Sequence, residues 1–212
     1  MVNERYFSGE GALAYARKYE RSAARRLSSA REKRCVRLAL EAVDARGAIL
    51  DLPCGAGRFQ NIIAEHADKC FAGDLSFPML LLCGERARMF HLPSHRFLAD
   101  VFALPLREGA LDGIVVMRLL HHISSPEQRH ALLAEVARVA RRFLVLSFLD
   151  AGSVKQRFAR LRQHLGRRPG RRSALAREVL AAEIEAFGFR VLGFFPVSSL
   201  FSGQTVAACV RR

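Results

Sequence analysis

Short apolar runs and amphipathic segments alternate along the chain, which predicts strands followed by helices. Strands are predicted at 48–52, 69–73, 95–99, 113–117, 143–149, 189–197 and 205–210. Helices are predicted at 11–28, 30–43 and 58–66, after Ser76, from Ser125 to 142, and from Ser173 to 188. This alternation is typical of an α/β protein with a doubly wound parallel sheet. No helix separates the last two strands, so we expect them to pair antiparallel.

Two regions depart from this alternation. Two predicted helices precede the first strand, and we interpret residues 1–46 as an N-terminal helical lid on a main domain of residues 47–212. Between the fifth strand and the last helix, Val154 and Phe158 begin an apolar stripe at helical spacing. The same stretch carries many cations and no acid after Asp150. We therefore expect residues 151–172 to form a basic lid insert.

Asp51 lies at the end of the apolar run of the first predicted strand, and a loop of small residues runs from Pro53 to Gly57. In a doubly wound sheet, this strand–loop–helix step is where a ligand meets backbone N–H groups. Gly55 and Gly57 lack a Cβ, so a ligand can lie against the main chain there. The dinucleotide pattern G-x-G-x-x-G fits poorly, because its third glycine would fall on Gln60.

Counted from Asp51, the run reads D-x-P-x-G-x-G. It resembles motif I of class I S-adenosylmethionine (SAM) dependent methyltransferases, D/E-x-G-x-G-x-G, with Pro53 replacing the first glycine and removing one N–H. Residues 72–80 and 100–105 are similar to later motifs of that family, and the nearest general pattern is the small-molecule, ubiquinone/menaquinone-type branch. The resemblance implies a seven-stranded, mostly parallel, Rossmann-like sheet with an antiparallel last strand.

The resemblance also assigns cofactor contacts. Asp51 would approach the methionyl amino group of SAM, Asp74 would hold the ribose and Asp100 the adenine. The complete set of expected cofactor-binding residues is Asp51, Pro53, Cys54, Gly55, Gly57, Asp74, Leu75, Asp100, Val101 and Met117. The alternatives are that the loop is an ordinary turn of an α/β protein and that Asp74 is a turn or cap residue.

Two histidines follow the fourth predicted strand, at the edge where the resemblance places the transferable methyl. A histidine there is suited to take a proton from an acceptor hydroxyl or amine, because its pKa is near neutral. We expect His122, or else His121, to be that group. The alternative is that one of them only caps or packs.

The formal net charge is +14 and favours an anionic partner, although a coding bias toward arginine would produce the same excess. Arg118, Arg167, Arg168, Arg171 and Arg172 are the candidate acceptor contacts. A basic amphipathic helix also suits peripheral contact with an anionic membrane. A nucleic-acid acceptor is less favoured, because Met117-Arg118-Leu119-Leu120 replaces the D/N/S-P-P-aromatic motif of exocyclic-amine methyltransferases.

The five cysteines lie apart and form no C-x-x-C pair, so the sequence predicts neither a disulfide framework nor a metal site. Neither a bilayer-length apolar run nor a leader pattern is present, which favours a cytoplasmic protein, with membrane association left open.

The sequence thus predicts an enzyme that transfers a methyl group from SAM to an O, N or C nucleophile of a small molecule, including an anionic lipid or sugar phosphate. The other product is S-adenosylhomocysteine (SAH). The alternatives are a catalytically inactive methyltransferase-like subunit and a nucleic-acid methyltransferase. The sequence predicts no oligomeric state.

Overall fold

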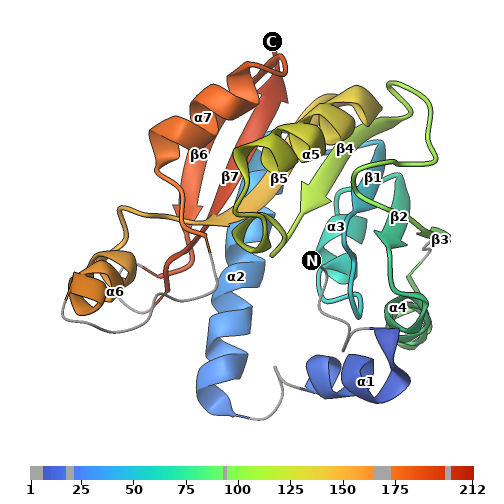
Figure 1. Cartoon of the computed structure of the whole chain (residues 1–212). Helices are drawn as coiled ribbons and strands as arrows, with labels where there is room; N and C mark the ends of the chain where they lie inside the picture. Colours follow the sequence, from blue (N-terminus) through green and yellow to red (C-terminus); the bar gives the residue numbers. More distant parts are fainter. Residues whose placement is uncertain (1–6, 18–21, 93–94, 165–172, 199–201) are drawn as a thin grey trace.

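The computed structural model describes residues 7–17, 22–92, 95–164, 173–198 and 202–212. Its centre is a seven-stranded sheet (Figure 1) in the order β3-β2-β1-β4-β5-β7-β6. The strands are β1 (Ala48–Asp51), β2 (Lys69–Asp74), β3 (His95–Leu98), β4 (Leu111–Val116), β5 (Ala140–Leu149), β6 (Phe189–Pro196) and β7 (Gln204–Arg211).

The strand directions confirm the predicted sheet. β1 pairs in parallel with β2 and β4, β2 with β3, and β4 with β5. β7 runs antiparallel to both β5 and β6. All six residues of β4 are buried, as expected for a central strand covered on both faces.

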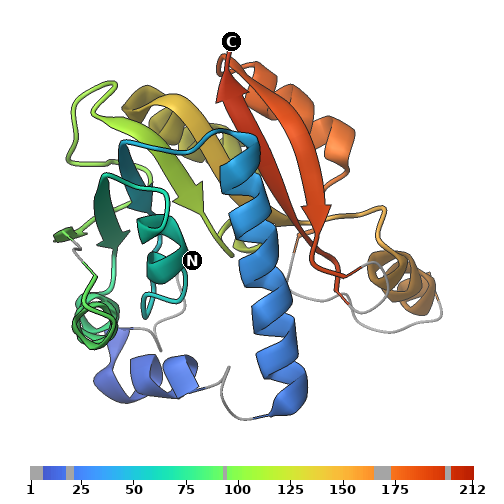
Figure 2. The same ribbon diagram turned by 180° about the vertical axis from the view of Figure 1, so that it is seen from behind.

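Helices cover both faces of the sheet. They are α1 (Gly9–Arg17), α2 (Ala23–Ala42), α3 (Gln60–Ala64), α4 (Phe77–Met89), α5 (Pro126–Val139), α6 (Val154–His164) and α7 (Arg177–Glu185), with a 3₁₀ turn, η2 (Leu120–His122). Figure 2 shows α2 and α3 in front of the sheet, with α5 and α7 behind it. Val36 and Leu40 of α2 join Ile62 of α3 in one apolar core, while Leu132 of α5 and Leu180 of α7 join the other.

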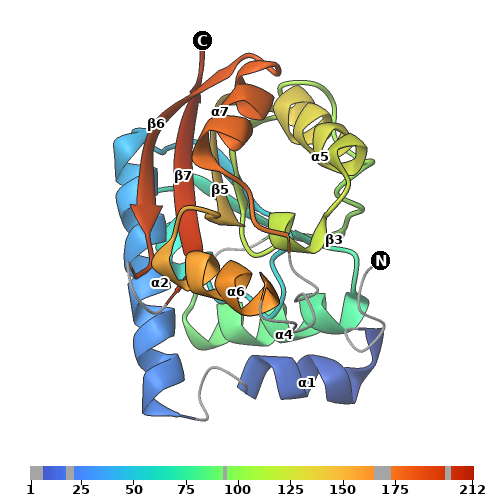
Figure 3. The same ribbon diagram turned by 60° about the vertical axis from the view of Figure 1, so that its left-hand side comes forward.

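The parallel strands end on the side of the molecule where α1, α4, α6 and the first half of α2 lie (Figures 1 and 3). Ala12 of α1 is fully buried against Ala56 of the loop after β1 and Met79 of α4. α1 therefore packs over the loop that follows β1. The division into a lid of residues 1–46 and a main domain stays a prediction, although the second half of α2 belongs to the core.

Several predicted boundaries differ from the structure, and three of them have an identifiable physical cause. The expected break near residues 28–30 lies inside α2, because Ser22 caps this helix by accepting the Arg25 N–H at 3.3 Å. The last helix is preceded by Ala176 rather than Ser173, whose N–H donates instead to the His121 carbonyl at 3.0 Å. β5 begins at Ala140 rather than at residue 143, because pairing with β4 continues past the end of α5.

Candidate cofactor and acceptor site

Asp51 ends β1 and is fully buried. Its Oδ2 accepts a 2.9 Å hydrogen bond from Gln60 Nε2, whereas Oδ1 has no hydrogen-bond partner among the described residues. Burial raises the pKa of Asp51 to about 7, and the charge of Asp74 adds to the rise while Gln60 and Arg58 oppose it. A buried carboxylate oxygen without a donor is costly, so this atom marks a place where a cationic group fits.

The loop after β1 turns tightly through Gly55 (φ +51°) and Gly57 (φ +72°). A Cβ on Gly57 would lie 3.0 Å from Cys83 Sγ and 3.2 Å from the Cys83 Cα, so the helix α4 leaves room only for glycine. Cys54 is buried, and its contact with the Cys83 thiol together with burial raises its thiol pKa. A thiol with a raised pKa is a poor nucleophile, which agrees with the interpretation of Cys54 as a lining residue.

Asp74 ends β2 next to this loop. Its Oδ2 accepts the Gly55 N–H at 2.8 Å and its Oδ1 accepts the Ser76 N–H at 2.9 Å. Burial raises the pKa of Asp74, and these backbone hydrogen bonds oppose the rise. Each carboxylate oxygen keeps acceptor capacity beyond its one backbone donor. The adjacent Leu75 is 41% exposed, so an apolar wall stands open beside Asp74.

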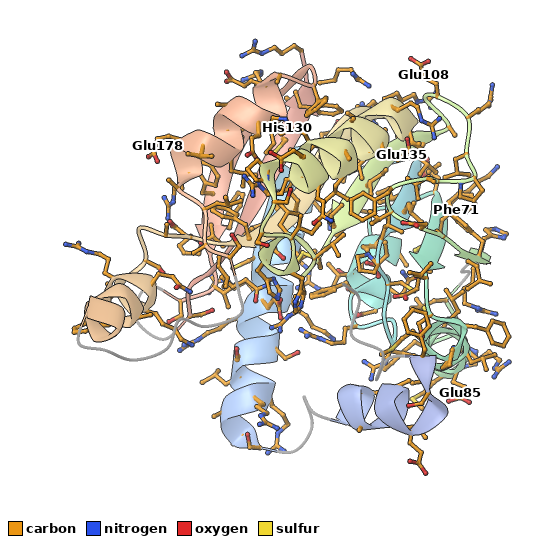
Figure 4. All side chains as sticks on the ribbon, in the orientation of Figure 1. Phe71, Glu85, Glu108, His130, Glu135 and Glu178 are labelled. Carbon is orange, nitrogen blue, oxygen red and sulfur yellow. The ribbon has the colours of Figure 1, made fainter. Side chains whose placement is uncertain are left out.

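The stretch after β3 lies near the same edge. Asp100 is exposed, and its Oδ1 accepts the Phe102 N–H at 3.0 Å in a local turn. Val101 is half-buried, and Leu98 and Phe102 are largely exposed. Glu135, labelled on α5 in Figure 4, accepts the Leu104 N–H at 2.6 Å and so ties the end of this stretch to α5.

Met117, Arg118 and the two histidines follow β4. Met117 is buried, and Arg118 adopts a left-handed backbone (φ +59°) with its N–H donating to Ser147 Oγ at 2.7 Å. His121 is buried and His122 exposed, with their ring centroids 4.2 Å apart. Of the two, only His122 therefore lies open to an incoming acceptor.

Sequence reasoning missed Glu32 of α2, which is fully buried. Glu32 accepts hydrogen bonds from Arg58 Nη2 at 2.6 Å, from Arg118 Nε and Nη2 at 2.8 and 2.9 Å, and from Gln204 Nε2 at 2.7 Å. Burial alone would raise the pKa of Glu32, but Arg118 and Arg58 outweigh it and hold the pKa below its usual value. No local pattern in the sequence signals contacts of such long range.

The candidate acceptor contacts Arg167, Arg168, Arg171 and Arg172 lie outside the described residues.

The described residues include no group of three or more His, Cys, Asp or Glu side chains that could hold a metal, and no helix long and apolar enough to span a bilayer. A shallow hollow of about 470 Å³ opens between α6 and α7, and its lining includes neither Asp51 nor Asp74.

Comparison with known proteins agrees with this geometry. Residues 49–142 match the family model described as "Methyltransferase domain". The matched segment is thus similar to a methyltransferase domain. It contains Asp51, the glycine loop, Asp74, Asp100 and the residues after β4.

The chain is similar over 95 residues (30% identity, 44% of this chain) to a tRNA (carboxymethyluridine(34)-5-O)-methyltransferase of Xenopus tropicalis, but that match covers only 14% of the relative. It is 29% identical over 180 residues to an uncharacterised protein of a Streptomyces fradiae transposon, covering 79% of this chain and 51% of that one. The chain thus matches only a small part of the length of the tRNA methyltransferases to which it is similar.

Among solved structures, the magnesium protoporphyrin IX methyltransferase of Synechocystis with bound SAH superposes with a TM-score of 0.80. The match covers 98% of this chain and 97% of that one at 19% identity. At this identity the likeness shows the shared fold.

The residues at the carboxyl edge fit SAM. The unpartnered Oδ1 of Asp51 suits an ammonium group, and each oxygen of Asp74 keeps acceptor capacity for a hydroxyl. The chemistry of these groups agrees with the SAH that is bound in the Synechocystis structure.

Proposed function

We propose that this protein transfers the methyl group of SAM to an oxygen of an anionic acceptor. The observation that carries the proposal is the buried Asp51 carboxylate, which ends β1 beside the glycine loop with one oxygen unpartnered among the described residues. A cationic amino group on the ligand would satisfy this oxygen and would hold Asp51 in its ionised form.

Four groups would hold the cofactor. Asp51 binds the methionyl amino group, and the backbone at Gly55 and Gly57 lies beneath that end. Asp74 accepts hydrogen bonds from the ribose hydroxyls, with Leu75 as an apolar neighbour. Asp100 accepts from the adenine amino group, with the half-buried Val101 beside it. Pro53, Cys54 and Met117 line the same edge.

SAM supplies a methyl group that is already activated as part of a sulfonium. The chain's own residues then have three tasks, which are to align the acceptor oxygen, to exclude water and to accept a proton where one is released. An ionised acceptor oxygen releases none and needs no base. For a neutral hydroxyl, the exposed His122 is the group positioned at the end of β4 to take the proton.

Charge supports an anionic acceptor. Exposed cations gather on the first half of α2 and on α6, both of which lie at the carboxyl edge: Arg25, Arg26, Arg31, Arg34, Lys155 and Arg157. The Xenopus relative is named as a tRNA (carboxymethyluridine(34)-5-O)-methyltransferase, which agrees with an oxygen acceptor. The ubiquinone/menaquinone-type branch, the inactive subunit and contact with a membrane stay predictions.

The test is transfer of radiolabel from methyl-labelled SAM into fractionated cell extract, followed by identification of the labelled product. We expect the labelled product to derive from an anionic small molecule, with release of label by mild base where a carboxylate has become a neutral methyl ester. Label in a cationic or neutral amine product would overturn the acceptor class, and binding of SAM with no labelled product in any fraction would favour the inactive subunit.

A tRNA acceptor is the second candidate, because four of the curated relatives are tRNA methyltransferases. A tRNA ligand would bind through phosphates, so its affinity would fall steeply with salt. Incubation of the protein with bulk tRNA and labelled SAM distinguishes the two acceptors. Label in nuclease-sensitive material supports tRNA, and its absence supports the small molecule.

A further inference from the structure

One carboxylate joins the two loops that border the proposed cofactor site. Arg58 follows Gly57 in the loop after β1, and Arg118 follows Met117 at the end of β4. β1 and β4 are neighbours in the sheet, so these loops leave the same edge side by side. Both guanidinium groups donate to Glu32 of α2, a helix that packs on one face of the sheet.

The charges in this cluster are buried and unequal. Arg58 and Glu32 are almost completely shielded from solvent, and the Arg118 side chain is 24% exposed. The carboxylate of Glu32 faces two guanidinium groups, so the cluster keeps one net positive charge. Gln204 of β7 adds neutral hydrogen bonds, because its Nε2 donates to both Glu32 Oε1 and Ser147 Oγ. Such a cluster need not stabilise the fold, because well-packed apolar residues in place of a buried ion pair often give equal or greater stability.

The position of the cluster indicates another role. The second half of α2 is held in the core through Val36, Ala39 and Leu40, so the helix does not depend on Glu32 to dock. Arg118 has a left-handed backbone, which a residue other than glycine adopts only where its surroundings hold it there. Hydrogen bonds to Glu32 and Ser147 help to hold Arg118 in this conformation.

We propose that Glu32 is a positioning residue which, through Arg58 and Arg118, fixes the loops after β1 and β4 in the arrangement that accepts SAM. Binding of the cofactor at the glycine loop is thereby coupled to α2. The first half of this helix carries the exposed cations Arg25, Arg26, Arg31 and Arg34. This inference rests on the proposed binding of SAM.

The first test measures SAH binding by calorimetry for the whole chain and its variants. Glu32→Gln removes the charge and keeps the shape, and the double variant Glu32→Gln/Arg118→Met restores the net charge of the cluster to its original value. We expect both to bind SAH about 10-fold more weakly than the wild type, since a small displacement of a binding loop has effects of this order. The matched control is Glu183→Gln, which breaks another buried ion pair, to Arg129, between α5 and α7.

The control should lower the melting temperature and leave SAH affinity within about twofold, because this ion pair joins α5 to α7 and these helices pack in a different apolar core from α2 and α3. The inference is overturned if either folded Glu32 variant binds SAH as tightly as the wild type. Absence of SAH binding by the folded wild type is a different result, since it refutes the proposed function itself.

The second test uses the wild type alone and does not depend on variants that fold. Hydrogen exchange is followed with and without SAH. Coupling through Glu32 predicts slower exchange in residues 28–36 of α2 as well as in residues 54–60 of the loop when SAH binds. Protection confined to the loop, with α2 unchanged, contradicts the inference even where the variants are destabilised.

Discussion

The backbone N–H of Gly55 donates a 2.8 Å hydrogen bond to Oδ2 of Asp74, which joins the loop after β1 to the end of β2. This contact positions the glycine loop and at the same time aims the carboxylate proposed to hold the ribose. Because Asp74 has both roles, even a substitution that keeps the size of its side chain should affect both stability and ligand binding.

Asp74→Asn replaces a carboxylate that accepts two backbone N–H groups with an amide that has only one acceptor oxygen. One N–H loses its acceptor, so we expect the free energy of unfolding to fall by about 1–3 kcal/mol. SAH affinity should fall about 10-fold or more, since the ribose contact and the loop are both affected. Denaturant titration and calorimetry measure the two effects.

Asp112→Asn is the matched control for Asp74→Asn. Asp112 also accepts a backbone N–H, from Ala48 at 2.9 Å, but at the opposite end of β1. Its variant should lose stability without losing SAH affinity. Equal losses of affinity in both variants would show that the effect of Asp74→Asn is indirect.

Asp51 should make stability depend on pH. Its pKa lies near 7 in the folded protein and near 3.8 when the chain unfolds, so the folded state keeps the proton over that range. The contribution of Asp51 to the free energy of unfolding is complete below about pH 4 and is lost as the pH rises through 7. Each unit by which the folded-state pKa exceeds the unfolded-state pKa corresponds to about 1.4 kcal/mol of this loss. Asp51→Asn should flatten this dependence in denaturation curves recorded at pH 5 and 8. An unchanged slope would show that Asp51 does not titrate in this range.

The same carboxyl should release a proton when SAH binds. An ammonium group beside Asp51 favours the ionised form, so binding below pH 7 expels the proton that burial had kept. Calorimetry in buffers of different ionisation enthalpy measures this release, which we expect at pH 6 and not at pH 8.5. Asp51→Asn should abolish it and weaken binding. A binding enthalpy independent of the buffer at pH 6 would exclude the assigned role.

Gly57→Ala should damage the site by two effects. Its φ of +72° is strained for a residue with a Cβ, and that Cβ would lie only 3.0–3.2 Å from Cys83. Gly109→Ala is the matched control, because Gly109 also has a positive φ (+60°), but a Cβ at that position would meet nothing within 4 Å among the described residues. We expect a loss of about 1 kcal/mol for Gly109→Ala and clearly more for Gly57→Ala, with weaker SAH binding only in the latter.

The cysteines should react slowly while the protein is folded. All five are buried, and burial raises the thiol pKa of Cys70 and Cys209 to about 12, while Cys54 is raised by its contact with Cys83 as well as by burial. A thiol reagent at pH 8 should therefore modify the folded chain far more slowly than the chain in denaturant. Rapid modification of Cys54 alone would contradict its interpretation as an inert lining residue.

Local signals in the sequence predicted most of the fold. A serine with a proline one or two residues later marked the starts of α4 and α5, and Ser76 and Ser125 do cap those helices. Helix starts of this kind depend on neighbours three residues apart, which a sequence displays directly. The motif after β1 likewise placed Asp51 and the glycine loop at the edge of the sheet where the structure has them.

The features that the sequence did not reveal depend on distant residues. Glu32 meets Gln204 across 172 positions of the chain, and nothing in the residues around Glu32 distinguishes it from the charges of a solvated helix face. The predicted start of the last helix at Ser173 failed for a similar reason, since Ser173 pairs with the carbonyl of His121. Tertiary contacts outweighed local preference in both cases.

The central claim is that the carboxyl ends of β1 and β2 bind the methionyl and ribose parts of a SAM-like ligand. A crystal structure of the wild-type chain with SAH tests it most directly. We predict SAH beside the glycine loop, with its amino group on Asp51 and its ribose on Asp74. SAH bound elsewhere, or a structure in which Asp51 and Asp74 contact only protein groups at saturating SAH, would contradict this account.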